Sequence, residues 1–388
     1  MASLPFSASQ MLTLAQQETG IDYDDGAILP ALQKLVDSFN ADGNPHEQGA
    51  QMLHQRVLRS LKNRVRMGRD FNAHPEIFDQ RIARPIFICG MARTSSTKTQ
   101  KLLAASGDFN FLTYWKALNP ALYSGDPTES PQARIEDAEQ YAKWFDEQSP
   151  DTKYGHSFEA HEPEEDSDIL GHSMVSPVWF GWAPLGGYLE WLGEIGLSEQ
   201  FETLRNTLKY LQWQGLATQD KRWILKCPLY SGLEPLLLEV FPDATLIMTH
   251  RTNVQTIGSG LRLLECFYQP FTDLRPEPDS YVEGVKGATD LHMKWRAEQP
   301  SDRFLDIPFS ASIKDPDRCV REMYRYAGET LSEVSFERMR LWTQSNPQNK
   351  YGKHQYSLAQ YGLTESGIRE AFAEYEAFND GLEAAWGY

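Results

Sequence analysis

Arg84-Pro-Ile-Phe-Ile-Cys-Gly-Met-Ala-Arg-Thr-Ser-Ser-Thr97 begins as a strand and ends as a helix. The apolar run 85–89 has the length and composition of a buried strand, and it stops at Gly90. A basic residue and four hydroxyl residues follow, and then a helical pattern through Ser106. Backbone N–H groups at such a junction form an anion site that the helix dipole supports. We therefore predict that this loop binds a phosphate-like group.

Further short apolar runs follow along the chain, at 223–226, 245–250 and 304–308. Helical patterns separate them, for example at 199–216 and 233–241. Continuous apolar runs that alternate with helices are typical of a parallel sheet buried on both faces. The fold class that we predict is α/β: a three-layer, P-loop-like fold with a central parallel sheet and helices on both faces.

The first part of the chain has a different pattern, with helical stripes at 7–19, 27–39 and 48–69. We predict an N-terminal helical segment over residues 1–83, packed on an α/β domain over residues 84–388. An irregular lobe at about 110–200, rich in proline, glycine, acidic and aromatic residues, is expected on the acceptor side of that domain. We interpret the basic face of 48–69 as a solvated helix surface.

Composition limits the class of protein. The chain has 388 residues, 41% of them hydrophobic, and a net charge of −17, which disfavours a nucleic-acid partner. The four cysteines form no CxxC pair, so we expect buried free thiols. No apolar run is long enough to span a bilayer and the start lacks a signal peptide pattern, so we predict a cytoplasmic protein.

A second anion site is predicted where the run 245–250 ends. Arg251 follows that strand, and Ser259 lies eight residues later on the next helix. Ligands of open α/β sheets collect at the carboxyl ends of the strands, where an arginine and a hydroxyl can hold a phosphate from two sides. The loop at Gly90 lacks the second glycine and the lysine of a Walker A motif, which argues against a Mg²⁺-dependent nucleotide triphosphatase. Two separate anion sites suggest a nucleotide with phosphates at both ends.

Together these motifs resemble the bacterial sulfotransferases that use PAPS (3′-phosphoadenosine-5′-phosphosulfate), over nearly the whole chain. Residues 84–97 resemble the family's strand and P-R-[ST]-G-T-T loop, and residues 223–228 its W-x-L-K-x-P motif. Residues 241–251 resemble F-P-D-A…T-H-R, and residues 352–364 the basic cofactor segment and closing helix. The resemblance implies PAPS as donor, PAP (adenosine-3′,5′-bisphosphate) as product and no required metal.

The resemblance also implies roles for single residues. Arg93 and Lys226 would be catalytic, because Arg93 would stabilise the leaving phosphate and Lys226 would contact the transferring group. The residues implied to bind the donor are Arg93, Thr94, Ser95, Ser96 and Thr97 at the 5′ end, Arg251 and Ser259 at the 3′-phosphate, and Lys353 and His354. Two loop residues depart from the family pattern, since Ala92 replaces a proline and Ser95 a glycine. We expect Ser95 to alter the turn and weaken donor binding.

The base that takes the acceptor's proton is assigned to the segment 155–166, which resembles the family's H…A…P-E-E-[CD] run. His156 is the first choice, then Glu164, then His161. We predict no metal here, because His156 and His161 are poorly spaced for zinc. Trp115, Trp179 and Trp182 line part of the acceptor pocket or belong to the core.

The predicted function is transfer of a sulfuryl group from PAPS to a hydroxyl, or less often an amine, of a small-molecule acceptor by in-line displacement. Two alternatives stay open at this point. One is a nucleotide-dependent phosphotransferase. The other is a catalytically degenerate protein of the same fold that only binds nucleotides.

Overall fold

The chain folds into two compact units in the computed structural model, which describes residues 7–347, 352 and 356–388. Unit 1 contains residues 1–82, 113–219 and 264–276, and unit 2 contains residues 83–112, 220–263 and 277–388. The predicted lobe at 110–200 therefore falls largely in the same unit as the N-terminal helices. The division into domains 1–83 and 84–388 stays a proposal.

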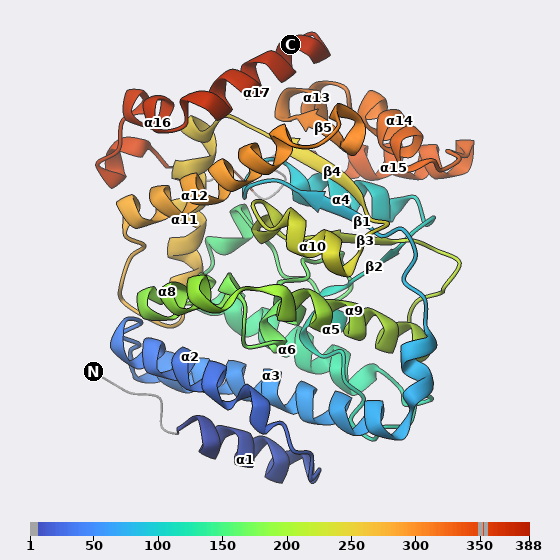
Figure 1. Ribbon diagram of the computed structural model, residues 1–388, viewed down its shortest axis with the longest axis vertical. Helices are drawn as coiled ribbons and strands as arrows, with labels where there is room; N and C mark the ends of the chain where they lie inside the picture. Colours follow the sequence, from blue (N-terminus) through green and yellow to red (C-terminus); the bar gives the residue numbers. More distant parts are fainter. Residues whose placement is uncertain (1–6, 348–351, 353–355) are drawn as a thin grey trace. The chain divides into compact units, whose positions relative to one another are not determined.

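Unit 2 is built on a parallel sheet of five strands in the order β2-β3-β1-β4-β5 (Figure 1). Its strands are β1 (Ile86–Cys89), β2 (Asn110–Phe111), β3 (Trp223–Lys226), β4 (Thr245–His250) and β5 (Phe304–Pro308). The apolar runs of the sequence form β1, β3, β4 and β5, so the predicted α/β class and the parallel sheet are confirmed. The short edge strand β2 was not predicted.

Helices cover both faces of this sheet, because alternate strand residues carry apolar side chains to opposite sides. Ile86, Ile88 and Ile224 point to the face covered by α4, α14 and α15, whereas Phe87 meets Tyr230 and Phe241 on the other face. The helices of unit 2 are α4 (Ser96–Ala105), α10 (Glu234–Val240), α11 (Asn253–Tyr268, whose last residues belong to unit 1), α12 (Pro278–Ala297), α13 (Phe309–Lys314), α14 (Pro316–Ala327), α15 (Glu333–Ser345), α16 (Glu365–Ala371) and α17 (Ala373–Trp386), with 3₁₀ turns η5 (Pro228–Tyr230), η6 (Ser301–Arg303) and η7 (Leu358–Tyr361).

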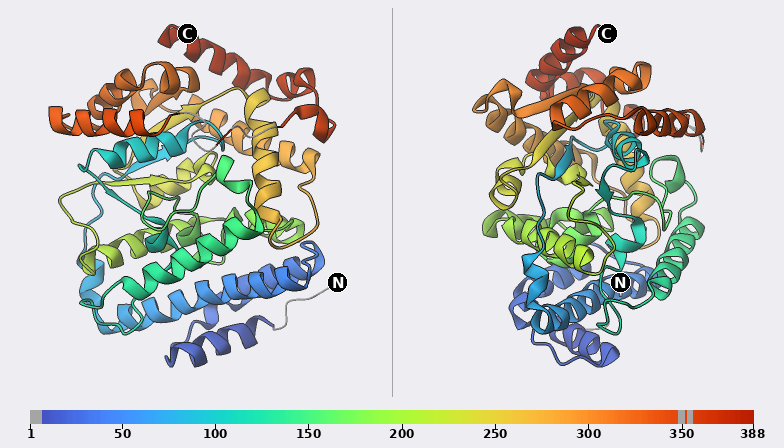
Figure 2. Two further views of the ribbon diagram at one scale, coloured as in Figure 1. Left: turned by 180° about the vertical axis from the view of Figure 1, so that it is seen from behind. Right: turned by 90° about the vertical axis from the view of Figure 1, so that its right-hand side faces the viewer.

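Within its described residues, unit 1 is helical. The helices are α1 (Ala8–Thr19), α2 (Leu29–Ala41), α3 (Glu47–Ala73), α5 (Tyr114–Leu118), α6 (Gln132–Gln148), α7 (Ser167–His172), α8 (Gly186–Ile195) and α9 (Ser198–Trp213), with 3₁₀ turns η1 (Gly26–Ile28), η2 (Pro75–Asp79), η3 (Thr152–Tyr154) and η4 (Pro177–Gly181). The predicted N-terminal helices correspond to α1, α2 and α3, and α1 lies beside α3 in both views of Figure 2. One continuous core joins them to residues 114–192 and to Phe271.

The basic face of α3 is not a solvated surface, so that interpretation was wrong. Arg56 is 5% exposed, forms an ion pair with Asp168 and lies 3.6 Å from the centre of the Trp182 ring. Arg64 contacts Asp25 through its Nε at 2.5 Å. These charges are internal partners of acidic residues that are distant in sequence, and they tie the segments of unit 1 together.

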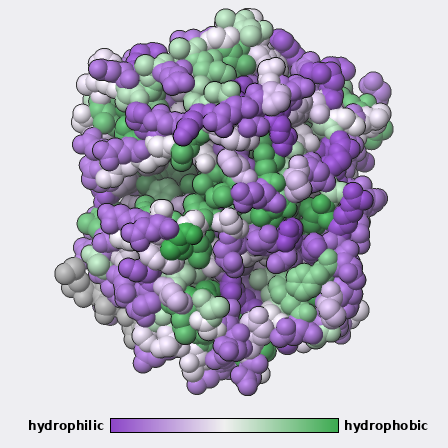
Figure 3. All heavy atoms as spheres, in the orientation of Figure 1, coloured by the Kyte–Doolittle hydropathy of each residue, from purple (hydrophilic) through white to green (hydrophobic). Residues whose placement is uncertain are grey.

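The face of the molecule drawn in Figure 3 is mainly polar, in keeping with the acidic composition. Hydrophilic residues cover most of the face in Figure 3, and the apolar residues on it gather in separate patches. A search of the described residues finds no helix that is both long and apolar enough to cross a bilayer. All four cysteines are buried free thiols, as predicted.

Candidate functional site

The loop between β1 and α4 has the strand–turn–helix geometry that the sequence predicts. Gly90 has φ +131°, and a Cβ there would lie 2.4 Å from the carbonyl oxygen of Thr249. Only glycine fits, because both the backbone conformation and the space exclude a side chain. The turn continues through Arg93 with φ 73° and Ser95 with φ 80°, and α4 begins at Ser96. The first backbone N–H groups of α4 are therefore available to an anion.

Ser95 adopts a left-handed backbone conformation in this turn. Its φ of 80° and ψ of 12° lie in the left-handed region that glycine adopts most easily. The expectation that Ser95 alters the turn relative to a glycine-containing loop stays a prediction, and so does its effect on donor binding. An L-residue held in this region raises the energy of the folded backbone by about 1–2 kcal/mol.

Thr94 secures the loop from the inside. Its Oγ1 donates to the carbonyl oxygen of Met91 at 2.8 Å and lies 2.7 Å from the Oγ1 of Thr249, which bonds to the carbonyl oxygen of Cys89 at 3.1 Å. Thr94 is 1% exposed, and Ser96 is buried as well, whereas Thr97 is exposed. The hydroxyl of Thr94 therefore joins the loop to β1 and β4.

The two predicted anion sites meet at Arg93. Arg93 donates from its Nε to the Oγ of Ser259 at 2.9 Å, and Arg251 donates from an Nη to the backbone oxygen of Arg93 at 3.0 Å. The guanidinium of Arg251 also lies 3.9 Å from the centre of the Phe309 ring. Burial lowers the pKa of Arg251, and the charge of Arg93 lowers it further while Tyr356 raises it. The structure thus brings together three of the side chains that sequence reasoning selected.

The position of Arg251 follows from how α11 begins. Arg251 comes directly after β4, and the carboxylate of Glu376 on α17 accepts hydrogen bonds from the backbone N–H of Asn253 and the hydroxyl of Thr252, both at 2.6 Å. A carboxylate at a helix N-terminus stabilises the unpaired N–H groups and the helix dipole. Glu376 is 5% exposed, so it fixes the start of α11 from within the fold.

Lys226 is the last residue of β3 and is 1% exposed. β3 and β4 are parallel to β1 on either side of it. The carboxyl ends of these strands therefore share one edge of the sheet, where Lys226, the loop after Gly90 and Arg251 all begin. In the strand order, β3 and β2 lie on one side of β1, and β4 and β5 lie on the other. The order of the strands therefore reverses at β1, and ligands of open α/β sheets usually bind at such a point.

A polar network lies behind the loop and was missed by sequence reasoning. His250 contacts Asp306 at 2.9 Å, and Arg296 donates to the same carboxylate at 2.8 Å. His292 contacts Glu234 through its Nδ1 at 2.8 Å, and its buried Nε2 has no partner among the residues that the structure describes. These side chains come from four separate elements, β4, β5, α10 and α12. The sequence therefore contains little sign of the network beyond the position of His250 directly before Arg251.

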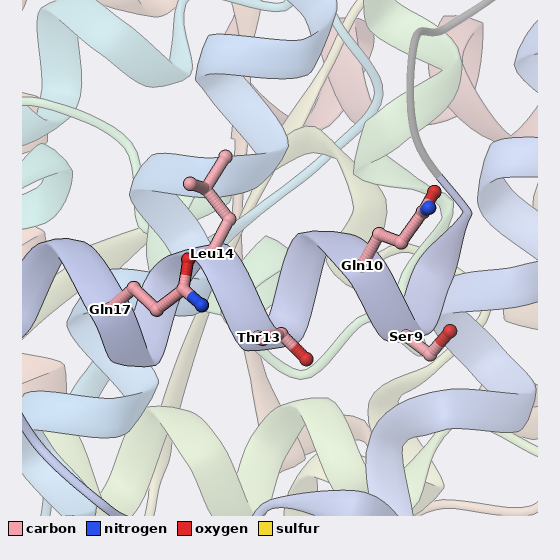
Figure 4. A pocket seen from close by; sticks show the side chains of 5 residues that line it. All are labelled: Ser9, Gln10, Thr13, Leu14 and Gln17. Carbon is pink, nitrogen blue, oxygen red and sulfur yellow. The ribbon is translucent and has the colours of Figure 1, made fainter.

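A small cavity of about 10 Å³ lies among these groups, with room for about one water molecule. Its lining combines loop residues with the network: Gly90, Met91, Ser231, Met248, Thr249, His250, Thr289, His292 and Tyr375. A second hollow, shown in Figure 4, is lined by five residues of α1 alone, and none of them is charged. Because no cationic side chain lines it, we do not take that second hollow as a candidate anion site.

The predicted acid–base segment lies in unit 1. The Nε2 of His156 is 3.1 Å from a carboxylate oxygen of Glu164, and both side chains are about nine-tenths buried. Glu165 is close as well, since one ligand atom from each of these three residues lies within 4.8 Å of the others. His161 stands apart, because its side chain is 68% exposed and faces Glu139 at 3.9 Å. The structure therefore pairs His156 with Glu164 but not with His161.

The remaining predicted residues are the two of the basic cofactor segment and the three tryptophans. Lys353 and His354 lie outside the described residues, so their roles stay predictions. The three tryptophans lie in the core of unit 1, where Trp115 is 5%, Trp179 2% and Trp182 9% exposed. Of the two interpretations given to them, the structure supports the core.

The comparison with protein families decides the class of this protein. A model of the sulfotransferase family matches residues 85–333. The chain belongs to the sulfotransferase family. It is a transferase, and the group that it transfers is a sulfuryl group. The phosphotransferase and binding-only alternatives have no support from these comparisons.

Individual relatives agree with this assignment. The sulfotransferase has 26% sequence identity to sulfotransferase STF9 from Mycobacterium avium, whose crystal structure it matches with a TM-score of 0.82 over 95% of each chain. It shares its fold with STF1 from Mycobacterium tuberculosis (24% identity, TM-score 0.77, covering 96% of this chain and 100% of that one). Among curated proteins it is 24% identical to the omega-hydroxy-beta-dihydromenaquinone-9 sulfotransferase Stf3 of Mycobacterium bovis, over 77% of this chain and 78% of that protein.

Proposed function

We propose that this sulfotransferase uses PAPS as its donor and transfers the sulfuryl group to a hydroxyl, or less often an amine, of a small-molecule acceptor. The observation that carries the proposal is the convergence of Arg93, Arg251 and Ser259 at the carboxyl edge of the sheet. PAPS supplies an activated sulfuryl group on its 5′-phosphate and carries a second phosphate at the 3′ position. One loop and one arginine–serine pair suit those two anionic ends.

The residues present fit such a donor. The start of α4 offers unpaired N–H groups to the 5′ end, and Thr97 adds an exposed hydroxyl beside them. Arg251 and Ser259 are assigned to the 3′-phosphate, for which a planar guanidinium is well suited. Arg93 reaches from the loop to Ser259 and so links the two ends.

Catalysis is assigned to positioning and fixed charge, as in phosphoryl transfer. In-line displacement places negative charge on the leaving phosphate and on the sulfuryl oxygens. We assign Arg93 to the leaving phosphate and Lys226 to the sulfuryl oxygens. Removal of one such group costs about 2–4 kcal/mol of transition-state stabilisation when oxyanion-hole deletions are taken as a guide.

We assign the base to the pair formed by Glu164 and His156. A carboxylate and an imidazole in contact can take a proton from a hydroxyl and share it. Aromatic rings adjoin this pair, since the His156 ring lies 4.7 Å from Phe158 and 5.8 Å from Phe267 between ring centres. These rings suit an acceptor whose hydroxyl is attached to an apolar body. The relative Stf3, whose name specifies a hydroxylated menaquinone, is in keeping with that class.

Metal independence is part of the proposal and needs its own test, because His156, Glu164 and Glu165 lie close enough to hold an ion. A turnover assay with labelled PAPS should give the same rate with and without EDTA. A rate that falls with EDTA and returns with a divalent ion would contradict this part of the proposal.

Calorimetry tests the donor. The parent protein should bind PAP without Mg²⁺ and more tightly than ATP, whereas a preference for Mg²⁺·ATP would overturn the proposal. Arg251→Ala should weaken PAP binding about tenfold or more, because it removes a charged donor from the 3′-phosphate. Arg325→Ala is the matched control, since that arginine is 71% exposed and pairs with Glu322 on the same helix.

A further inference from the structure

Ser259 is flanked by two glycines in the interior of α11, and tyrosine side chains occupy the space beside both. A Cβ on Gly260 would lie 2.0 Å from the hydroxyl oxygen of Tyr281. A Cβ on Gly258 would lie 3.0 Å from the ring of Tyr356. Glycine inside a helix costs about 0.5–1 kcal/mol relative to alanine, so the segment gives up helix stability for close approach. At Gly260 the group that approaches is a hydroxyl.

Tyr281 is held in this position from α12. Its ring packs against the apolar cluster that contains Ile257, Leu261 and Val285, and its hydroxyl lies against the backbone of Gly260. The residue before Gly260, Ser259, receives the hydrogen bond from Arg93. The hydroxyl of Tyr281 therefore lies against the residue that follows Ser259 in α11, and the charge of Arg93 acts on it.

The charge state of Tyr281 suits a donor. Burial raises the pKa of Tyr281 to about 12, and the guanidinium of Arg93 acts in the opposite direction. The phenol is thus protonated at neutral pH and lies within the electrostatic reach of Arg93. The side chain of Tyr281 is only partly buried, so a ligand can approach its hydroxyl. A protonated phenol can donate a hydrogen bond to an anionic oxygen.

We propose that the Tyr281 hydroxyl is a further donor to the 3′-phosphate monoester of the nucleotide, beside Arg251 and Ser259. The inference rests on the proposed function, because it assigns one more residue to the same subsite. It also explains why Gly260 is needed, since any side chain there would displace the hydroxyl. It predicts that Tyr281 distinguishes nucleotides by their 3′ substituent.

The test compares PAP with adenosine 5′-phosphate (AMP), which differs from PAP only in lacking the 3′-phosphate. Calorimetry on the full chain should show that Tyr281→Phe raises the Kd for PAP about tenfold and leaves the Kd for AMP unchanged. If the parent prefers PAP and Tyr281→Phe keeps the whole of that preference, the inference is wrong and the proposed function stands. If the parent binds PAP no better than AMP, both are wrong.

A second variant reaches the same hydroxyl without changing the tyrosine. Gly260→Ala places a methyl group where the hydroxyl lies and should reduce PAP binding, again with AMP unaffected. Gly284→Ala on α12 is its control, because a Cβ at Gly284 meets no atom within 4 Å. Gly284→Ala should bind PAP as the parent does. Equal PAP affinity in Gly260→Ala and Gly284→Ala would refute the inference, provided that both variants show the parent's thermal transition.

Discussion

Ser95 is the residue whose backbone is under the clearest local constraint. Its φ of 80° favours glycine, so Ser95→Gly should relieve about 1–2 kcal/mol of conformational energy. Glycine also makes the unfolded chain more flexible, which costs about 0.5–1 kcal/mol. We therefore expect the free energy of unfolding, measured in urea, to rise by about 1 kcal/mol or less.

The neighbouring residue provides the control for this prediction. Ser96 is the first residue of α4, so Ser96→Gly gains no relief and should lose about 0.5–1 kcal/mol. Equal losses in the two variants would mean that Ser95 carries no strain.

Glu164 is the residue on which the proposed proton transfer depends. Glu164→Gln preserves the size of the side chain but cannot accept the proton, so turnover should fall by about 10²–10⁴-fold. The Kd for PAP should not change, because the assigned donor residues are all in other segments.

Glu139→Gln is the matched control, since Glu139 is exposed and faces His161, the least favoured candidate. Glu164→Gln with the parent's turnover would rule out Glu164 as the base. A loss confined to Glu139→Gln would point to His161 instead.

At the scale of elements, Asp306 joins β5 to β4 and α12 through His250 and Arg296. Burial raises the pKa of Asp306, but the hydrogen bonds and charges of these partners outweigh burial and lower it to about 2. A carboxyl group with a lowered pKa stabilises the folded state above its unfolded pKa of about 4. That stabilisation, on the order of 2 kcal/mol, is lost as the pH falls from about 4 through 2.

Asp306→Asn should therefore flatten this part of the stability curve. The loss of unfolding free energy between pH 5 and pH 2 should be about 2 kcal/mol smaller in the variant than in the parent. Asp317→Asn, at an exposed aspartate, should keep the parent's slope. Parallel curves for parent and Asp306→Asn would contradict the assignment of the acid sensitivity to Asp306.

The same elements explain what the sequence could predict. Four of the strands could be recognised because each is a continuous apolar run: β1, β3, β4 and β5. The strand β2 could not be recognised, because it has only two residues, Asn110 and Phe111. That Arg93, Arg251 and Ser259 lie near one another could be predicted, since parallel strands end at one edge of a sheet. Their individual hydrogen bonds could not. The partners of His250 and Arg56 could not be predicted from the sequence. Each partner lies more than 50 residues away along the chain.

At the scale of the whole molecule, the chain alternates between its two units. Unit 1 takes residues from three separate stretches, the last of which is 264–276. Phe271 from that stretch is fully buried, and its ring lies 5.7 Å from the centre of Trp182 and 6.3 Å from that of Phe145. Its carbonyl oxygen accepts a hydrogen bond from the backbone N–H of His46 at 3.2 Å. A short late segment thus completes the core that the first helices begin.

This interleaving constrains how the protein is made. The ribosome translates β1, β3 and β4 before Phe271. The N-terminal helices of unit 1 therefore lack the segment 264–276 of their core during most of synthesis. Premature termination anywhere before residue 264 would release a polypeptide whose aromatic interior cannot close. Such truncated products should be captured by chaperones or degraded, and no stable remnant of the N-terminal helices is expected to accumulate.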